Sequence, residues 1–269
     1  MSSFVSRLAV ALAGLPVVLA AAWVGGWLLF GLAALAAVLA LHELYRLARE
    51  LRPLVLAGYA PALGILAAAE LDRPVWMLGA FLAAFILAFL FAAVSETRQY
   101  TTVAIGTTVL GAAWIGFGLG ALLLVRDAPV AAVDGRQLVF TLLLTVFAND
   151  TFAYLGGRMA GRHKMSPVMS PGKTWEGLVV GAAVAVFTCW VSVYRSGYLE
   201  GWRAFVLAGA LILAATIGDL FESLAKRDLG VKDTGRLLAG HGGMLDRIDS
   251  LLFAAPAAYF TLLGLGEIH

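Results

Sequence analysis

Residues 74–94 read PVWMLGAFLAAFILAFLFAAV and contain no charged side chain. A helix that crosses the hydrocarbon core of a bilayer needs about 20 largely apolar residues. Residues 102–125 are also free of charge. Across the chain of 269 residues, 61% are apolar and 13% are charged, whereas a soluble domain carries about 25% charged residues. Too little polar surface is left to coat a soluble globule, so the sequence predicts an all-α, polytopic integral membrane protein.

Apolar runs of spanning length recur along the chain and predict about nine transmembrane helices. The first run follows a single base, Arg7, which also suits a cleaved signal peptide. The apolar sequence resumes directly after Gly25-Gly26, so we read this run as a retained anchor. The predicted spans are 8–24, 27–45, 54–70, 74–94, 102–125, 137–157, 177–194, 203–222 and 248–266.

The basic residues predict the orientation of these helices. Lys and Arg concentrate in cytoplasmic segments. With the N-terminus inside and nine crossings, 14 of the 19 Lys and Arg residues fall on the inner side. We therefore expect a cytoplasmic N-terminus in a bacterial cytoplasmic (inner) membrane, with the active site facing the cytoplasm.

The long connections predict two regions. Residues 1–135 hold about five helices with short links, and residues 136–269 form a C-terminal catalytic region. The catalytic region has two cytoplasmic loops, 158–176 and 223–247, which are rich in glycine and charge. Function on a scaffold of rigid helices is expected on such loops.

Asp150 is a carboxylate that the membrane should exclude. It lies eight residues before Arg158, roughly 12 Å into its helix. A charge at that depth costs a few kcal/mol unless it is paired or hydrated. Tyr154 and Arg158 share its helical face. Asp150 is therefore a site candidate, with a structural ion pair to Arg158 or another base as the alternative.

Asp219, Ser223 and Lys226 follow at i, i+4 and i+7, so they stack on one face of the eighth helix. This stripe offers a carboxylate, a hydroxyl and an ammonium group. A membrane-interface anchor would explain Lys226 and Arg227. It would leave Asp219 on the buried side.

Asp246 and Asp249 are i, i+3 neighbours at the start of the last helix, after the glycine-rich segment that holds His241. Acidic residues also serve as plain helix caps, and His241 alone is often a structural hydrogen-bonding group. Mg²⁺ prefers oxygen ligands, often one or two carboxylates with substrate phosphates. Asp219, Asp246 and Asp249 thus form a candidate metal site.

Ser170-Pro171-Gly172-Lys173-Thr174 predicts a tight turn that leads into a helix. Exposed backbone N–H groups, a lysine and a hydroxyl at such a turn suit an anion. A P-loop is excluded because Pro167 stands where that pattern needs glycine. A positively charged loop near anionic lipid is the simpler alternative. Together with the carboxylates, these loops indicate phosphoryl or nucleotidyl transfer, which needs mainly positioning and charge neutralisation.

The stretch from Ser223 to Asp249 resembles the signature of the phosphatidate cytidylyltransferases, also called CDP-diacylglycerol synthases. It reads S-x2-KR-x4-KD-x-G-x2-LAGHGG-x2-DR-x-D over 27 positions. A second region, from Asp150 through Ser170, Lys173 and Thr174 to Gly177, is also similar to that family. The resemblance covers about 149–250, whereas the N-terminal half matches only as apolar helices.

The resemblance implies that CTP and phosphatidic acid are converted to CDP-diacylglycerol and pyrophosphate with a divalent metal, Mg²⁺ with an optional second cation. Asp219, Asp246 and Asp249 would hold the metal, and with Lys226 and His241 they form the predicted catalytic set. The predicted substrate-binding residues are Asp150, Arg158, Ser170, Lys173, Thr174, Ser223, Arg227, Lys232, Asp233 and Arg247.

Three alternatives remain open on the sequence. They are a membrane lipid kinase, a cytidylyltransferase for another lipid phosphate, and a transporter, since charges within the membrane also mark ion paths. The expected partners are the two substrates and the bilayer, with no nucleic acid. Exposed Gly and Ala faces would permit a homodimer.

Overall fold

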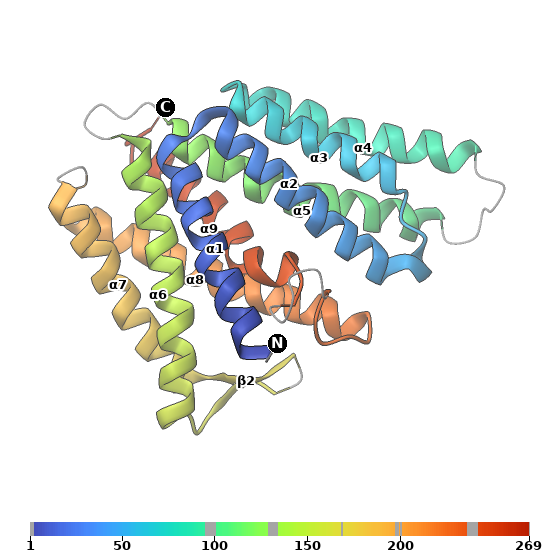
Figure 1. Cartoon of the computed structure of the whole chain (residues 1–269). Helices are drawn as coiled ribbons and strands as arrows, with labels where there is room; N and C mark the ends of the chain where they lie inside the picture. Colours follow the sequence, from blue (N-terminus) through green and yellow to red (C-terminus); the bar gives the residue numbers. More distant parts are fainter. Residues whose placement is uncertain are drawn as a thin grey trace. The chain divides into compact units, whose positions relative to one another are not determined.

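The computed structural model describes residues 3–94, 101–128, 134–167, 169–196, 199, 201–235 and 242–268. Within these ranges the chain forms nine α-helices, a short 3₁₀ helix η1 and one β-hairpin (Figure 1). Each predicted span coincides with one helix. The elements are α1 (Ser3–Val24), α2 (Gly26–Leu47), η1 (Ala48–Leu51), α3 (Val55–Glu70), α4 (Pro74–Val94), α5 (Thr101–Asp127), α6 (Gly135–Ala160), β1 (Lys164–Ser166), β2 (Ser170–Thr174), α7 (Trp175–Ser196), α8 (Gly201–Asp228) and α9 (Leu245–Gly264).

Six of these helices in the described part of the chain are long and apolar enough to cross a membrane: α2, α4, α5, α6, α7 and α8. The prediction of an all-α, polytopic membrane protein is therefore confirmed. The number of nine crossings and the cytoplasmic N-terminus stay predictions. Helices α1 and α3 contribute shorter apolar stretches, and α9 is not among the six candidate spans.

The helices divide into two compact units. The first comprises Met1–Asp127 with Val231–Ile248, and the second comprises Ala128–Gly230 with Asp249–His269. Residues 231–235 and 242–248 thus pack with the N-terminal helices, although they follow α8 in the chain.

The first unit has a buried central helix, α5, and an exposed, apolar helix, α4. Helix α5 is buried over 83% of its most apolar stretch, whereas α4 is buried over only 17%. The side chains of Phe85, Ile86 and Phe89 on α4 are exposed. A contiguous apolar face of this kind is unusual on a soluble protein and is what a bilayer would cover.

Tyr45 on α2 joins three helices of this unit. Its hydroxyl donates a hydrogen bond to the carbonyl oxygen of Thr108 on α5 at 2.8 Å. The Thr108 hydroxyl accepts one from the N–H of Leu54, just before α3, also at 2.8 Å. Gly58 and Gly111 leave room for the Tyr45 ring. These bonds fix the end of α2 on which Glu43 lies.

In the second unit, the predicted loop 158–176 is largely structured. Helix α6 continues to Ala160, and strands β1 and β2 pair in antiparallel fashion, with Lys164 opposite Thr174 and Ser166 opposite Ser170. The turn predicted at 170–174 is therefore a strand. Helix α8 continues to Asp228, so the second predicted loop starts later than expected.

Candidate active site

A pocket of about 480 Å³ lies in the second unit. One face of α6 supplies much of its wall, the hairpin supplies another part, and α7 and α8 complete it. The lining residues are Asn149, Asp150, Ala153, Tyr154, Gly157, Arg158, Lys164, Met165, Ser170, Gly172, Lys173, Thr174, Leu178, Thr216 and Asp219. Residues of the region from Asp150 to Thr174 thus meet Asp219, which the sequence also singled out, in one cavity.

The α6 wall has the periodicity that the sequence predicted. Asp150, Tyr154 and Arg158 all line the pocket. The Nδ2 of Asn149 donates to the Oδ1 of Asp150 at 3.2 Å. A carboxylate within an apolar helix therefore has a polar neighbour and faces a cavity, as the cost of burying a charge requires.

Small residues bring α6 and α7 close enough to shape this wall. A Cβ on Gly181 would lie 2.6 Å from the carbonyl oxygen of Asn149, and one on Gly177 would lie 2.5 Å from that of Ala153. Real Cβ atoms essentially never approach so closely. Gly177 and Gly181 stand four apart on one face of α7, the pattern that allows membrane helices to pack backbone to backbone.

The hairpin is tied to the start of α7. The carboxylate of Glu176 accepts hydrogen bonds from the N–H groups of Arg162 and His163 at 3.1 and 3.2 Å, and it lies 2.5 Å from the Nδ1 of His163. The Thr174 hydroxyl accepts from the N–H of Gly177 at 3.1 Å, which caps the helix. Thr174 is buried and its oxygen already has this structural role.

Lys173 reaches across the pocket. Its Nζ lies 2.5 Å from the Oδ2 of Asp219 on α8. The Ser223 hydroxyl, one turn further along α8, lies 3.4 Å from the Oδ1 of Asp219. The Nε of Arg227 donates to the carbonyl oxygen of Met169 at 3.4 Å. The hairpin and the C-terminal end of α8 therefore present bases and hydroxyls together.

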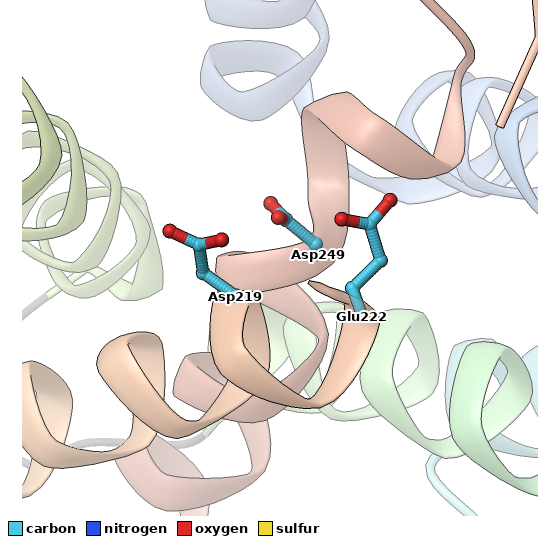
Figure 2. Close-up of side chains that lie close together, drawn as sticks. All are labelled: Asp219, Glu222 and Asp249. Carbon is cyan, nitrogen blue, oxygen red and sulfur yellow. The ribbon is translucent and has the colours of Figure 1, made fainter. Parts of the chain in front are cut away.

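Three carboxylates of the second unit converge beside this pocket. Figure 2 shows Asp219 and Glu222 on α8 and Asp249 on α9, with the Asp249 carboxylate between the other two in this view. One ligand atom from each lies within 4.8 Å of the others. Glu222 is buried and forms an ion pair with Lys226. Its place three residues after Asp219, on the same helical face, was the signal that could have identified it from sequence.

Asp246, the third predicted metal ligand, has different neighbours in the first unit. Its carboxylate accepts hydrogen bonds from the N–H of Gly243 at 2.7 Å and from that of Thr234 at 3.1 Å. Arg247 is exposed. His241 lies outside the described residues.

A second pocket, of about 690 Å³, lies in the first unit. Its walls come from the end of α2 and from the segment that holds Lys232 and Asp233. The lining residues are His42, Glu43, Arg46, Leu47, Lys232, Asp233, Thr234 and Gly235. The signature stretch predicted Lys232 and Asp233 as site residues but not the α2 residues, because the N-terminal helices carry no recognised motif.

Comparison with known proteins decides the family. The sequence model of the Cytidylyltransferase family matches residues 5–264. The chain belongs to this family. The match also covers the N-terminal helices, which the sequence motifs left unassigned.

The relatives of this family member are named phosphatidate cytidylyltransferase. One from Mycobacterium bovis (strain ATCC BAA-935 / AF2122/97) is 35% identical over 256 residues, which cover 85% of this chain and 78% of the relative. One from Mycobacterium leprae (strain TN) is 41% identical over 160 residues, 58% of this chain and 48% of the relative. One from Brucella abortus biovar 1 (strain 9-941) is 41% identical over 155 residues, 57% of this chain and 56% of the relative. The last two alignments thus span about half of the relatives' length.

Proposed function

We propose that this protein transfers the cytidylyl group of CTP to phosphatidic acid and releases pyrophosphate, giving CDP-diacylglycerol for phospholipid synthesis. The family match and the names of the relatives support the reaction. The structural observation that carries it is the Lys173–Asp219 pair, because it joins the basic hairpin that lines the pocket to the carboxylate cluster beside it.

A divalent cation fits the cluster. Asp219, Glu222 and Asp249 offer hard oxygen donors within 4.8 Å of one another, which suits Mg²⁺. We propose that these residues hold it, and Asp246 remains a further predicted ligand. The bound cation would supply positive charge against the phosphates of the nucleotide.

In this reaction the protein's side chains would neutralise charge and donate hydrogen bonds to phosphate groups. An ionised phosphate oxygen of phosphatidic acid attacks the α-phosphorus of CTP. The bond between the α-phosphorus and the oxygen that bridges it to the β-phosphate breaks, and pyrophosphate leaves. The nucleophile is already an anion, so no strong base is needed. Lys173, Arg158 and Arg227 would neutralise phosphate charge, and Ser170 and Ser223 would donate hydrogen bonds.

Two features of the chain support a membrane setting for this reaction. The apolar helices support contact with a bilayer, and the basic residues that cluster on one side support a cytoplasmic site in a bacterial inner membrane. Phosphatidic acid would then reach the pocket at the headgroup layer. A homodimer remains a prediction from the exposed small-residue faces.

Product analysis tests this proposal. Detergent-purified protein is incubated with phosphatidic acid, Mg²⁺ and CTP labelled at the α-phosphate. We expect label in lipid, an equal amount of pyrophosphate and loss of both with EDTA. Absence of labelled lipid from folded, lipid-replete protein would rule the reaction out. CTP labelled at the γ-phosphate, with diacylglycerol added as the lipid alcohol, then separates a lipid kinase, which labels lipid, from a transporter, which labels none.

A further inference from the structure

The carboxylate of Glu43 connects α2 to two segments of the signature stretch. Its Oε1 accepts the N–H of Met244, and its Oε2 accepts the N–H of Leu245, both at 2.9 Å. The Thr234 hydroxyl donates to Oε2 at 3.3 Å. These partners lie 191 to 202 residues away in sequence, so this contact exists only in the folded chain.

Glu43 is buried, with 2% of its surface exposed. A buried carboxylate is tolerated only where hydrogen bonds replace its hydration. Leu245 is the first residue of α9, so two of the three donors belong to the start of that helix. The positive end of a helix adds to this stabilisation.

Two glycines leave room for the Glu43 carboxylate to lie against the backbone of the signature stretch. A Cβ on Gly235 would lie 2.8 Å from the Oε1 of Glu43, and a Cβ on Gly243 would overlap both Glu43 and Thr234. Both positions therefore need glycine as long as Glu43 occupies this place. Asp246 also joins these segments, because its carboxylate accepts the N–H groups of Thr234 and Gly243.

These bonds define the second pocket. Glu43 is one of its lining residues, together with Arg46 from α2 and with Lys232 and Asp233 from the segment that follows α8. Lys232 and Asp233 have no helix or strand to fix them. Their placement depends on Thr234, which follows directly and is tied to Glu43 and Asp246.

We propose that Glu43 is a positioning residue for cytidylyl transfer, which holds Lys232 and Asp233 of the signature stretch in place against the start of α9. The inference rests on the proposed function. Glu43 acts through the segments it binds and does not itself contact a substrate.

Steady-state kinetics of Glu43→Gln in lipid micelles test the proposal, with CTP and phosphatidic acid varied separately. Glutamine keeps the volume but offers one acceptor oxygen in place of two, so at least one N–H or O–H donor loses its partner. We expect kcat/KM per folded molecule to fall at least tenfold. A rise in KM for CTP alone assigns the second pocket to the nucleotide phosphates, and a rise for phosphatidic acid alone assigns it to the lipid phosphate.

Two controls separate positioning from general stability. Leu41→Ala removes a fully buried side chain on the same helix without touching these bonds, and its folded fraction should keep wild-type KM and kcat. Glu50→Gln removes an exposed charge close by and should have no effect. If Leu41→Ala changes the kinetic constants as Glu43→Gln does, the positioning role is wrong.

Thr234→Val keeps the test valid if Glu43→Gln fails to fold, because it deletes one donor with little change in shape. It should lower kcat/KM about threefold to tenfold, the value of one hydrogen bond. The double variant should be no worse than Glu43→Gln alone. Wild-type constants in Thr234→Val and in any folded Glu43→Gln would overturn the proposal.

The hydrogen-exchange rates of backbone amides test the role of Glu43 independently of turnover. In Glu43→Gln, or in Thr234→Val, the amides of Met244 and Leu245, which donate to Glu43, should exchange faster than in the wild type. If the wild-type protein makes no CDP-lipid, the proposed function fails, whereas unchanged exchange at these amides refutes the role of Glu43.

Discussion

Lys173 on β2 and Asp219 on α8 form an ion pair, with 2.5 Å between Nζ and Oδ2. Both side chains are partly exposed to the pocket, Lys173 by 24% and Asp219 by 33%. In this ion pair each charge neutralises the other. A phosphate group that enters the pocket offers Lys173 a second anionic partner. A metal cation offers Asp219 a second cationic partner.

Replacing Lys173 by methionine keeps the length of the side chain and removes its charge. We expect kcat/KM for CTP to fall by about 10²–10³-fold, the usual cost of losing one group that stabilises developing negative charge. Arg49→Gln, at an exposed position in η1, is the matched control and should retain full activity. Near-wild-type turnover by Lys173→Met would remove Lys173 from the site.

Replacing Glu222 by glutamine tests its assignment as a metal ligand. The variant keeps the shape of the side chain but weakens its attraction for a cation. We expect the Mg²⁺ concentration for half-maximal activity to rise by at least about tenfold. Mn²⁺ binding followed by electron paramagnetic resonance should weaken in parallel. Asp228→Asn, exposed at the end of the same helix, should change neither value.

Asp246→Asn is expected to abolish turnover while leaving a folded protein in the membrane. Asparagine retains one acceptor oxygen, so part of the bonding to Thr234 and Gly243 persists. Mn²⁺ binding to the folded variant, followed by electron paramagnetic resonance, distinguishes the two roles of Asp246. A ligand role predicts weaker Mn²⁺ binding, a positioning role predicts unchanged binding, and wild-type-like turnover contradicts both roles.

Replacing Gly181 by alanine should disrupt the packing of α6 against α7. The added Cβ would lie 2.6 Å from the carbonyl oxygen of Asn149, so the helices must separate. We expect a loss of about 1–3 kcal/mol in the free energy of unfolding, measured as a lower thermal midpoint in detergent.

Gly209→Ala is the control for this packing variant. Gly209 lies inside α8 with no atom within 4 Å of an added Cβ. The substitution should leave stability unchanged or raise it by up to about 1 kcal/mol, because alanine favours helix more than glycine. Equal midpoints for the two variants would contradict the close packing of α6 and α7.

The sequence by itself determined the class of the protein and most of its helices. Charge-free runs such as 74–94 and the spacing of apolar residues act locally, so they are readable without knowledge of contacts. Local periodicity also placed Asp150, Tyr154 and Arg158 on one face, and all three line the first pocket. The family resemblance, confirmed by the match over residues 5–264, came from a signature of fixed spacing.

Only the tertiary structure decided which distant groups meet. It brought Lys173 to Asp219, placed Glu222 with Asp219 and Asp249, formed a strand at 170–174, and gave residues 231–248 to the unit of the N-terminal helices. Glu43 was missed because it lies near the end of the predicted span 27–45, close to His42 and Arg46, where a charged side chain is expected to reach water. Its partners lie about 200 residues away, and the burial that makes it stable exists only once those backbone N–H groups reach it.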